Sequence, residues 1–153
     1  MSRPSFVPTE FVAPRELRAQ RFRLEPLGPQ HNEADLAAWM SSIEHIQGTP
    51  GFANHGWPPD DGFSAADNLR DLERHADEFE RRVAFAFTVL PPDSVDASVV
   101  LGCLYLDPGP RPGAVDVRSW VRADVADLDA PLRHTVREWL ARSWPFDEII
   151  YAG

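Results

Sequence analysis

The sequence predicts a mixed α/β domain, of the α+β or α/β class, with a central mixed sheet of about five strands and three main helices. Apolar residues form five short strand-like segments and recur at helical spacing over three longer segments. One of these helices is expected between the last two strands, which makes those strands candidates for parallel neighbours. At 153 residues the chain has the length of one domain. We expect an extended N-terminal arm over residues 1–20 and a single domain over residues 21–153.

The N-terminal half is expected to supply one strand and two helices. Residues 21–27 alternate polar and apolar side chains, as a half-buried strand does. Asn32 is a good N-cap for the first helix, and Ser64 with Asp67 for the second. The expected core face of the first helix is Leu36, Trp39, Met40, Ile43 and Ile46. That of the second is Leu69, Leu72, Ala76, Phe79 and Val83.

The C-terminal half is expected to form a three-strand meander over residues 83–90, 99–106 and 114–122, followed by a helix and a strand. The helix is predicted over residues 128–144 and the last strand over residues 148–151. An apolar final strand exposes an edge that invites pairing. We expect the arm around Phe6, Val7, Phe11 and Val12 to pack over this end of the sheet, or a second copy to complete it as a homodimer.

Charge and composition narrow the possible partners. The chain has 24 acidic and 15 basic residues, a net charge of −9. This charge opposes binding to nucleic acid or anionic membranes and favours a cationic amine, although it also fits a solubility role alone. No apolar run approaches the roughly 20 residues of a membrane span, and no signal peptide is evident. The single cysteine, Cys103, is expected as a buried thiol, and we expect a cytoplasmic location.

The order of these elements resembles that of the GNAT superfamily of acyl-CoA N-acyltransferases, over about residues 21–151. Val100–Leu106 resembles the third strand of that family. Asp116–Val121 resembles its fourth strand, in which an acid stands near the start and Trp-Val near the end. Residues 32–36 and 43–46 are also similar to a small bacterial GNAT-like subgroup.

The resemblance implies acetyl-CoA as the acyl donor. In the family the pantetheine arm pairs with the fourth strand, and the pyrophosphate lies at the N-terminus of the next helix, where amides and the helix dipole favour an anion. The cofactor-binding residues implied are Trp120, Val121, Arg122, Leu128, Asp129 and Ala130.

The predicted pyrophosphate turn departs from the family pattern. Leu128 and Ala130 stand about where Gly-x-Gly or Gly-x-Ala is expected, and Asp127 and Asp129 bring negative charge. Pro131 removes an amide from the first helical turn. A capping aspartate and a first-turn proline explain the same residues structurally. The expected fourth helix and two further strands of the family do not follow residue 151.

Amine acylation needs a base for the amine and an acid for the leaving thiolate. The candidate catalytic residues are Asp116, Glu44 and His55. The candidate substrate-binding residues are Trp57, Asp60 and Asp61, from the loop that the resemblance places beside the acceptor. Each also fits a structural interpretation, Asp116 as an outward-facing strand residue and the loop residues as a buried Trp57 with solvated acids.

Other chemistries have little support. The five histidines show no metal-binding spacing, so no metal is expected. No P-loop or GxGxxG motif is present, and Ser119 and Cys103 lack a nucleophile elbow. Two functions stay open: a divergent GNAT-fold acyltransferase acting on a small amine, or a GNAT-like ligand-binding or interaction domain that has lost acyl-CoA binding.

Overall fold

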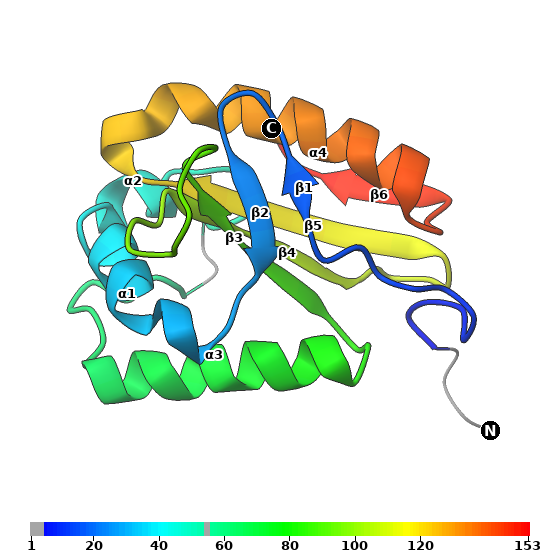
Figure 1. Cartoon of the computed structure of the whole chain (residues 1–153), viewed down its shortest axis with the longest axis horizontal. Helices are drawn as coiled ribbons and strands as arrows, with labels where there is room; N and C mark the ends of the chain where they lie inside the picture. The colour runs from blue at the N-terminus through cyan, green and yellow to red at the C-terminus, as the bar shows by residue number, and fades with distance from the viewer. Residues whose placement is uncertain (1–4, 54–55) are drawn as a thin grey trace.

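A computed structural model of the chain describes residues 5–53 and 56–153. A six-stranded sheet crosses the molecule (Figure 1). The helices α1 (Asn32–Met40), α2 (Ile43–Gln47) and α3 (Ala65–Glu80) pack on one face, and α4 (Asp129–Ser143) packs on the other. Two short 3-10 helices, η1 (Pro29–His31) and η2 (Ala123–Leu128), precede α1 and α4.

The sheet order follows the chain order. β1 (Leu17–Arg18), β2 (Arg23–Pro26), β3 (Phe85–Leu90), β4 (Gly102–Pro108) and β5 (Ala114–Val121) are antiparallel neighbours. β6 (Glu148–Tyr151) lies parallel to β5. The predicted meander and the predicted parallel pair are therefore confirmed, and β1, inside the expected arm, is the sixth strand.

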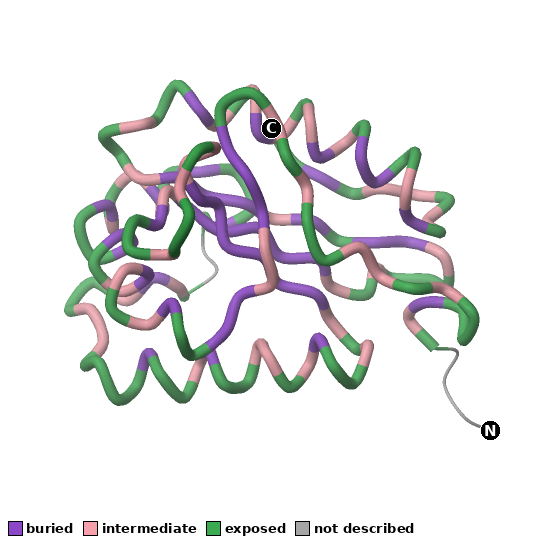
Figure 2. The backbone as a smooth tube through the Cα atoms, in the orientation of Figure 1, coloured by how far each residue is buried: buried purple, intermediate pink, exposed green. Residues whose placement is uncertain are grey.

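Two cores lie on the two faces of the sheet, because strand side chains alternate between faces. The α4-side core contains Phe85, Phe87, Val117, Val136 and Trp139. The α1–α3-side core contains Trp39, Leu72, Cys103, Tyr105 and Trp120. In Figure 2 the central strands are mostly buried, whereas the outer sides of the helices are exposed.

The first predicted helix is divided into α1 and α2. Ser41 Oγ donates a hydrogen bond to the Ala38 carbonyl at 2.7 Å, a local bond of the kind that competes with helical pairing. The prediction of Asn32 as N-cap is wrong, since η1 leads into α1 and the Asn32 side chain instead bonds the Ala65 carbonyl. Met40 is 42% exposed, so its predicted core position is also wrong.

The second predicted helix has its predicted cap, because Ser64 Oγ accepts a hydrogen bond from the Asp67 amide at 3.1 Å. Its core face is rotated from the prediction, with Asn68, Leu72 and Phe79 buried. Leu69 is 36% exposed, and Val83, which follows the end of α3, is 39% exposed.

The N-terminal arm packs on the α4-side core. Val7 is buried, and the Phe6 ring stacks 5.3 Å from Phe146 and 5.7 Å from Phe85. Val12, by contrast, is 84% exposed. The arm does not pair with β6, whose outer edge has no strand partner within residues 5–53 and 56–153. In the same part of the chain no helix combines the length and the apolar character that crossing a bilayer requires.

Candidate functional site

The sheet opens between β5 and β6. β6 pairs with β5 only from Ala114 to Val117, where Tyr151 is the last partner. β5 continues to Val121 and pairs with β4 along its other edge over this length. Residues 119–121 of β5 therefore have no strand partner on the β6 side within the described part of the chain. We call this opening the splay.

Two hydroxyl groups meet at the splay on the α4 side. Ser119 Oγ and Tyr151 Oη lie 2.5 Å apart, and both residues are buried. Burial raises the pKa of Tyr151 to about 12, against the opposing effect of the Ser119 hydrogen bond. The phenol therefore keeps its proton at neutral pH. The Arg137 guanidinium lies 5.1 Å from the centre of the Tyr151 ring and donates a hydrogen bond to the backbone carbonyl of Tyr151. These two contacts hold the ring in place.

The end of the described chain lies beside this position. A Cβ atom added at Gly153 would come within 2.8 Å of Arg133 Nε, so the last residue lies against the Arg133 side chain of α4. Arg133 also acts electrostatically on Tyr151 and on Asp129.

The turn from β5 into α4 is tied to α2 and its junction with α1. Ser42 Oγ accepts a hydrogen bond from the Ala123 amide at 2.8 Å. His45 Nε2 lies 3.2 Å from Asp129 Oδ2 at the start of α4. Burial raises the pKa of Asp129, and His45 partly offsets this effect. The buried Asp129 Oδ1 has no hydrogen-bond partner in the described residues.

A pocket of about 390 Å³ lies at this junction, lined by Ser41, Ser42, Ile43, Glu44, His45 and Ala123. Glu44 is exposed at its edge, beside the half-buried His45. The pocket therefore offers a carboxylate, an imidazole and two hydroxyls, a set suited to a polar or cationic group.

The opposite face of the splay is an aromatic cluster under the loop that follows α2. The Trp57 ring lies 5.4 Å from Trp39, 5.9 Å from Phe52, 6.5 Å from Tyr105 and 6.1 Å from Trp120. Trp120 is fully buried and donates its indole N–H to Tyr105 Oη at 3.0 Å. Trp57, a candidate substrate-binding residue, and Trp120, a candidate cofactor-binding residue, thus lie side by side and pack against each other.

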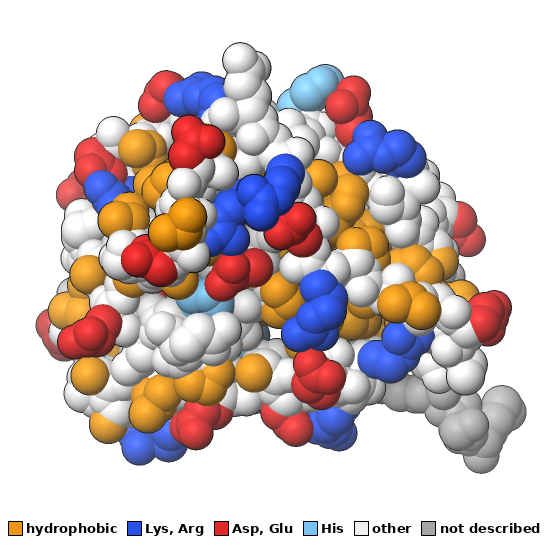
Figure 3. All heavy atoms as spheres, viewed as in Figure 1, with side chains coloured by type: hydrophobic (Ala, Val, Ile, Leu, Met, Phe, Trp, Pro, Cys, Tyr) orange, Lys and Arg blue, Asp and Glu red, His pale blue; other side chains and the backbone are white. Residues whose placement is uncertain are grey.

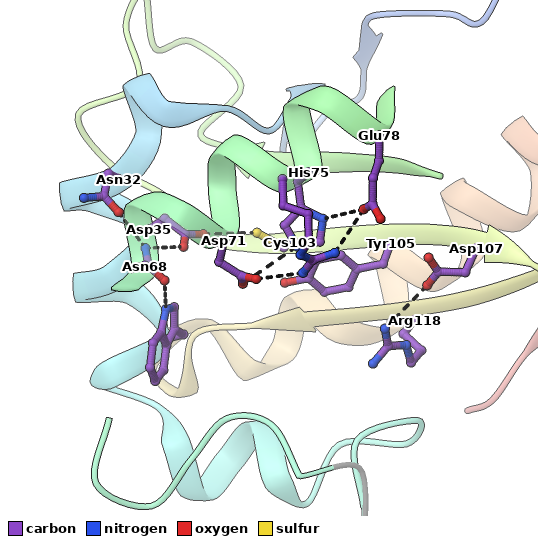
Figure 4. Close-up of polar contacts among 12 residues, drawn as sticks. Asn32, Asp35, Asn68, Asp71, His75, Glu78, Cys103, Tyr105, Asp107 and Arg118 are labelled. Carbon is purple, nitrogen blue, oxygen red and sulfur yellow. Dashed lines mark hydrogen bonds and ion pairs between the residues drawn. The ribbon is translucent and has the colours of Figure 1, made fainter. Parts of the chain in front are cut away.

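A buried polar cluster fixes α1 and α3 over the sheet (Figure 4). Asp35 accepts hydrogen bonds from Cys103 Sγ at 3.3 Å and from Asn68 Nδ2 at 3.2 Å. Asn68 Oδ1 accepts the Trp39 indole N–H at 3.0 Å. Burial raises the pKa of Asp35 and the pKa of the Cys103 thiol. The expected buried thiol is therefore confirmed, and these groups join the helices to the sheet.

Beyond this cluster, His75 of α3 faces Tyr105 of β4 with ring centroids 5.5 Å apart. Burial and the nearby Arg74 lower the pKa of His75 to about 4, so its imidazole is neutral at pH 7. Arg118 lies 5.4 Å over the Tyr105 ring and 3.5 Å from Asp107 (Figure 4).

Asp116 lies on this same face of β5, directly across from Asp107 of β4. It is exposed, and it forms no ion pair within the described residues. Because Asp116 adjoins Val117, its carboxylate stands where the splay begins, on the face opposite Tyr151.

The other residues predicted from sequence are scattered. His55 lies outside the described residues. Asp60 and Asp61 are exposed, and Asp60 accepts a hydrogen bond from Gln47 at 2.7 Å. Val121 and Leu128 are buried in the α4-side core, Ala130 is exposed, and Arg122 pairs with Asp124.

Sequence reasoning missed the pairing of Tyr151 with Ser119 and of His45 with Asp129. Neither pair has a local signal, because its members are 32 and 84 residues apart in the chain. Two features offered a partial signal: a tyrosine at the end of the last apolar strand, and a histidine in the last turn of a helix.

No family model and no curated protein sequence matches the chain. Solved structures do match. RimL, the ribosomal L7/L12 alpha-N-protein acetyltransferase, in complex with coenzyme A gives a TM-score of 0.66 at 12% identity, over 88% of this chain and 72% of that chain. The microcin C7 self-immunity acetyltransferase MccE, in complex with acetyl-CoA and AMP, matches with a TM-score of 0.63 at 11% identity. The match covers 87% of this chain and 69% of that chain. A GNAT-family acetyltransferase from Bacillus anthracis matches with a TM-score of 0.64 at 9% identity, over 89% of this chain and 72% of that chain. The chain therefore has a GNAT-like fold.

Proposed function

We propose that this chain is an N-acyltransferase that moves an acetyl group from a pantetheine thioester, acetyl-CoA being the one the fold suggests, to a small amine. The observation that carries the proposal is the splay. Over residues 119–121 of the described chain β5 has no strand partner on its β6 side, which is where a pantetheine arm would pair, and a protonated phenol and an exposed carboxylate lie on the two faces of this part of the sheet.

The chemistry divides between these two groups. The amine nitrogen attacks the thioester carbonyl carbon, the C–N bond forms and the C–S bond breaks. The proton lost by the amine is ultimately balanced by one gained by the sulfur. Asp116 is the proposed base for the amine, and Tyr151 the proposed donor of a proton to the thiolate.

The acceptor is expected to be cationic before it loses its proton. Asp116 lies across β4 and β5 from Asp107, whose carboxylate pairs with Arg118 at 3.5 Å, so the exposed Asp116 carboxylate is the one that an ammonium group would meet. On the face seen in Figure 3, acidic and basic side chains are interspersed rather than gathered into one basic field. RimL is described as acting on a protein α-amine, so peptide N-termini are a second acceptor class to test.

A second function is favoured by a specific observation. The contact of His45 with Asp129 covers the helix N-terminus that would hold a pyrophosphate, and Trp57 fills space above Trp120. Both features fit a GNAT-like ligand-binding or interaction domain without acyl transfer.

Titration with acetyl-CoA, followed by release of free thiol in the presence of spermidine or of a short peptide with a free N-terminus, separates the two functions. The proposal expects binding and amine-dependent thiol release that Asp116→Asn reduces. The exposed variant Asp93→Asn, with the same charge change on the loop between β3 and β4, serves as the control. No binding and no thiol release at high micromolar concentration would favour the second function.

A further inference from the structure

A pocket of about 780 Å³ lies at the end of β5 opposite the splay. Its walls come from three segments: the N-terminal arm at residues 5–7 and 9, the passage from α3 into β3 at residues 81–83, and the β4–β5 hairpin at residues 108–114. Figure 1 shows these three segments together at the right of the molecule. Because a strand rises about 3.3 Å per residue, Ala114 in the pocket and Ser119 in the splay lie roughly 16 Å apart along β5.

The lining of this pocket is cationic, although the chain is acidic. Arg81, Arg82 and Arg111 line it, and no aspartate or glutamate within residues 5–53 and 56–153 does. The chain as a whole has a net charge of −9. A ligand that enters the pocket therefore meets guanidinium groups from two separate elements, whereas most of the other charges of the molecule are negative.

Two of the three guanidinium groups are only partly occupied. Arg81 contacts Asp77 at 3.4 Å, and Arg111 contacts Glu148. Both carboxylates stand outside the lining of the pocket. A guanidinium carries five N–H donors, so one carboxylate contact leaves donors for a ligand.

The third guanidinium belongs to a residue in a strained backbone conformation. Arg82 has a φ of 62°, where glycine is the usual residue, and it forms no ion pair within the described part of the chain. Its Nη2 donates a hydrogen bond to the Pro8 carbonyl at 2.7 Å, which ties the arm to the end of α3. An arginine kept at such a position, beside a pocket, points to a role for its side chain there.

The hairpin wall is held in one conformation. Prolines stand at every second position over residues 108–112, and each fixes its own φ. The Gly109 amide donates to the Ala114 carbonyl at 3.0 Å, and the Ala114 amide to the Arg111 carbonyl at 3.1 Å. A wall that is already ordered costs a ligand less entropy on binding.

We propose that this pocket binds a small organic phosphate, with the phosphate on the three guanidinium groups and the apolar part of the ligand against Phe6, Val7 and Val83. The planar guanidinium matches phosphate oxygens in pairs, and a dianion suits several cations better than the single charge of a carboxylate. The volume lies within the roughly 300–1,000 Å³ of small-molecule pockets. This site does not depend on the proposed acyl transfer.

The test is a titration of the ¹⁵N-labelled whole chain with phenyl phosphate at pH 8, where the phosphate is a dianion, followed by amide chemical shifts. We expect saturable shifts at residues 5–9, 81–83 and 108–114, and none at residues 119–121. Benzyl alcohol keeps the ring without the charge, and inorganic phosphate keeps the charge without the ring. Each is expected to bind about tenfold more weakly or less. Added salt should weaken the binding of phenyl phosphate.

Variants assign the binding to the arginines. Arg81→Gln/Arg111→Gln keeps the contact of Arg82 with Pro8 and is expected to weaken phenyl phosphate binding about tenfold or more. The matched control is Arg18→Gln/Arg70→Gln, which makes the same charge change and also removes one exposed ion pair at each position, outside the lining. It should change the affinity less than about twofold. Thermal melts check that each variant is folded.

Arg82→Gly is a second way to remove a charge, because glycine keeps the backbone conformation of this turn. It too is expected to weaken binding about tenfold or more. Shifts centred on residues 119–121 and Tyr151, equal losses in the two double variants, or benzyl alcohol or inorganic phosphate binding as tightly as phenyl phosphate would each overturn the proposal. Shifts at the three walls, lost with the lining arginines and kept in the control, support it.

Discussion

The hydroxyl groups of Tyr151 and Ser119 share one hydrogen bond, 2.5 Å long, at the point where β5 and β6 separate. Because burial raises the pKa of Tyr151 to about 12, the phenol carries a proton throughout the neutral range. Ser119 can accept or donate in this pair, so it can orient the phenol toward the opening between the strands.

Tyr151→Phe removes the proposed acid and keeps the ring. If acyl transfer occurs here, we expect the rate constant of thiol release to fall about 10²- to 10⁴-fold, the usual contribution of a positioned general acid. Donor affinity should change much less, since the ring still packs. Ser119→Ala should have a smaller effect on the rate. An unchanged rate in Tyr151→Phe would remove this residue from the chemistry.

The free energy of unfolding should decrease as pH is lowered, because of His75. Its pKa is about 4 in the folded chain, against about 6.5 for a free histidine, so the unfolded chain takes up the proton first as pH falls. The stabilisation is complete above pH 6.5 and is lost progressively between about pH 6.5 and 4, amounting to about 3 kcal/mol. Urea unfolding at several pH values measures this slope.

His75→Gln should flatten the pH dependence, because glutamine takes up no proton. His134→Gln is the matched control, since the His134 side chain is 75% exposed on α4. The same slope in native chain and His75→Gln would show that other groups produce it.

Asp129 should give the opposite slope. Burial raises its pKa in the folded chain, so its ionisation opposes folding. Its contribution is fully favourable below the unfolded pKa and is lost as pH rises through the folded value. We therefore expect Asp129→Asn to gain stability relative to the native chain as pH rises from 4.5 to 7.5. Chemical denaturation at both pH values gives this difference, and a constant difference would contradict the expectation.

Arg82 occupies a backbone conformation that favours glycine. Its φ is 62°, and it ends α3 with hydrogen bonds from its own amide to Phe79 and from the Val83 amide to Glu78. This is the Schellman pattern, in which glycine is the usual residue. Its guanidinium bonds the Pro8 carbonyl and so ties down the N-terminal arm.

Comparing Arg82→Gly with Arg82→Ala isolates the energetic cost of a side chain at this positive φ, because both variants lose the contact with Pro8. We expect the glycine variant to be more stable by about 1–2 kcal/mol, the cost of a Cβ atom in the left-handed region. Guanidinium unfolding measures the difference. Equal stability of the two variants would mean that the turn changes conformation when the arginine is removed.

The strands and α4 could be predicted because their apolar side chains recur with a regular period. This period arises because each element packs against one of the two cores or lies between them. β6 has its predicted bounds, 148–151, and α4 differs from its prediction by one residue at each end. β1 could not be predicted, since two residues carry no period. The rotation of α3 escaped prediction because its buried Asn68 is polar, and hydrophobic spacing does not register a polar residue that bonds Asp35 and Trp39.

The candidate site was harder to predict from the sequence than the fold. Asp116 and the turn at Asp129 became candidates by resemblance, because they belong to a strand and to the start of a helix. The meaning of Tyr151 depends on the register that pairs it with Val117, and that of Asp129 on a histidine from another helix. Such contacts follow from how elements pack and leave no mark on the local sequence.

The position of Gly153 against Arg133 affects where an affinity tag can be attached for purification. An affinity tag fused after Gly153 would start at the mouth of the opening between β5 and β6, where it could compete with a donor. Binding should therefore be measured after any segment fused behind Gly153 has been cleaved off, because such a segment would otherwise lower the apparent affinity for a donor.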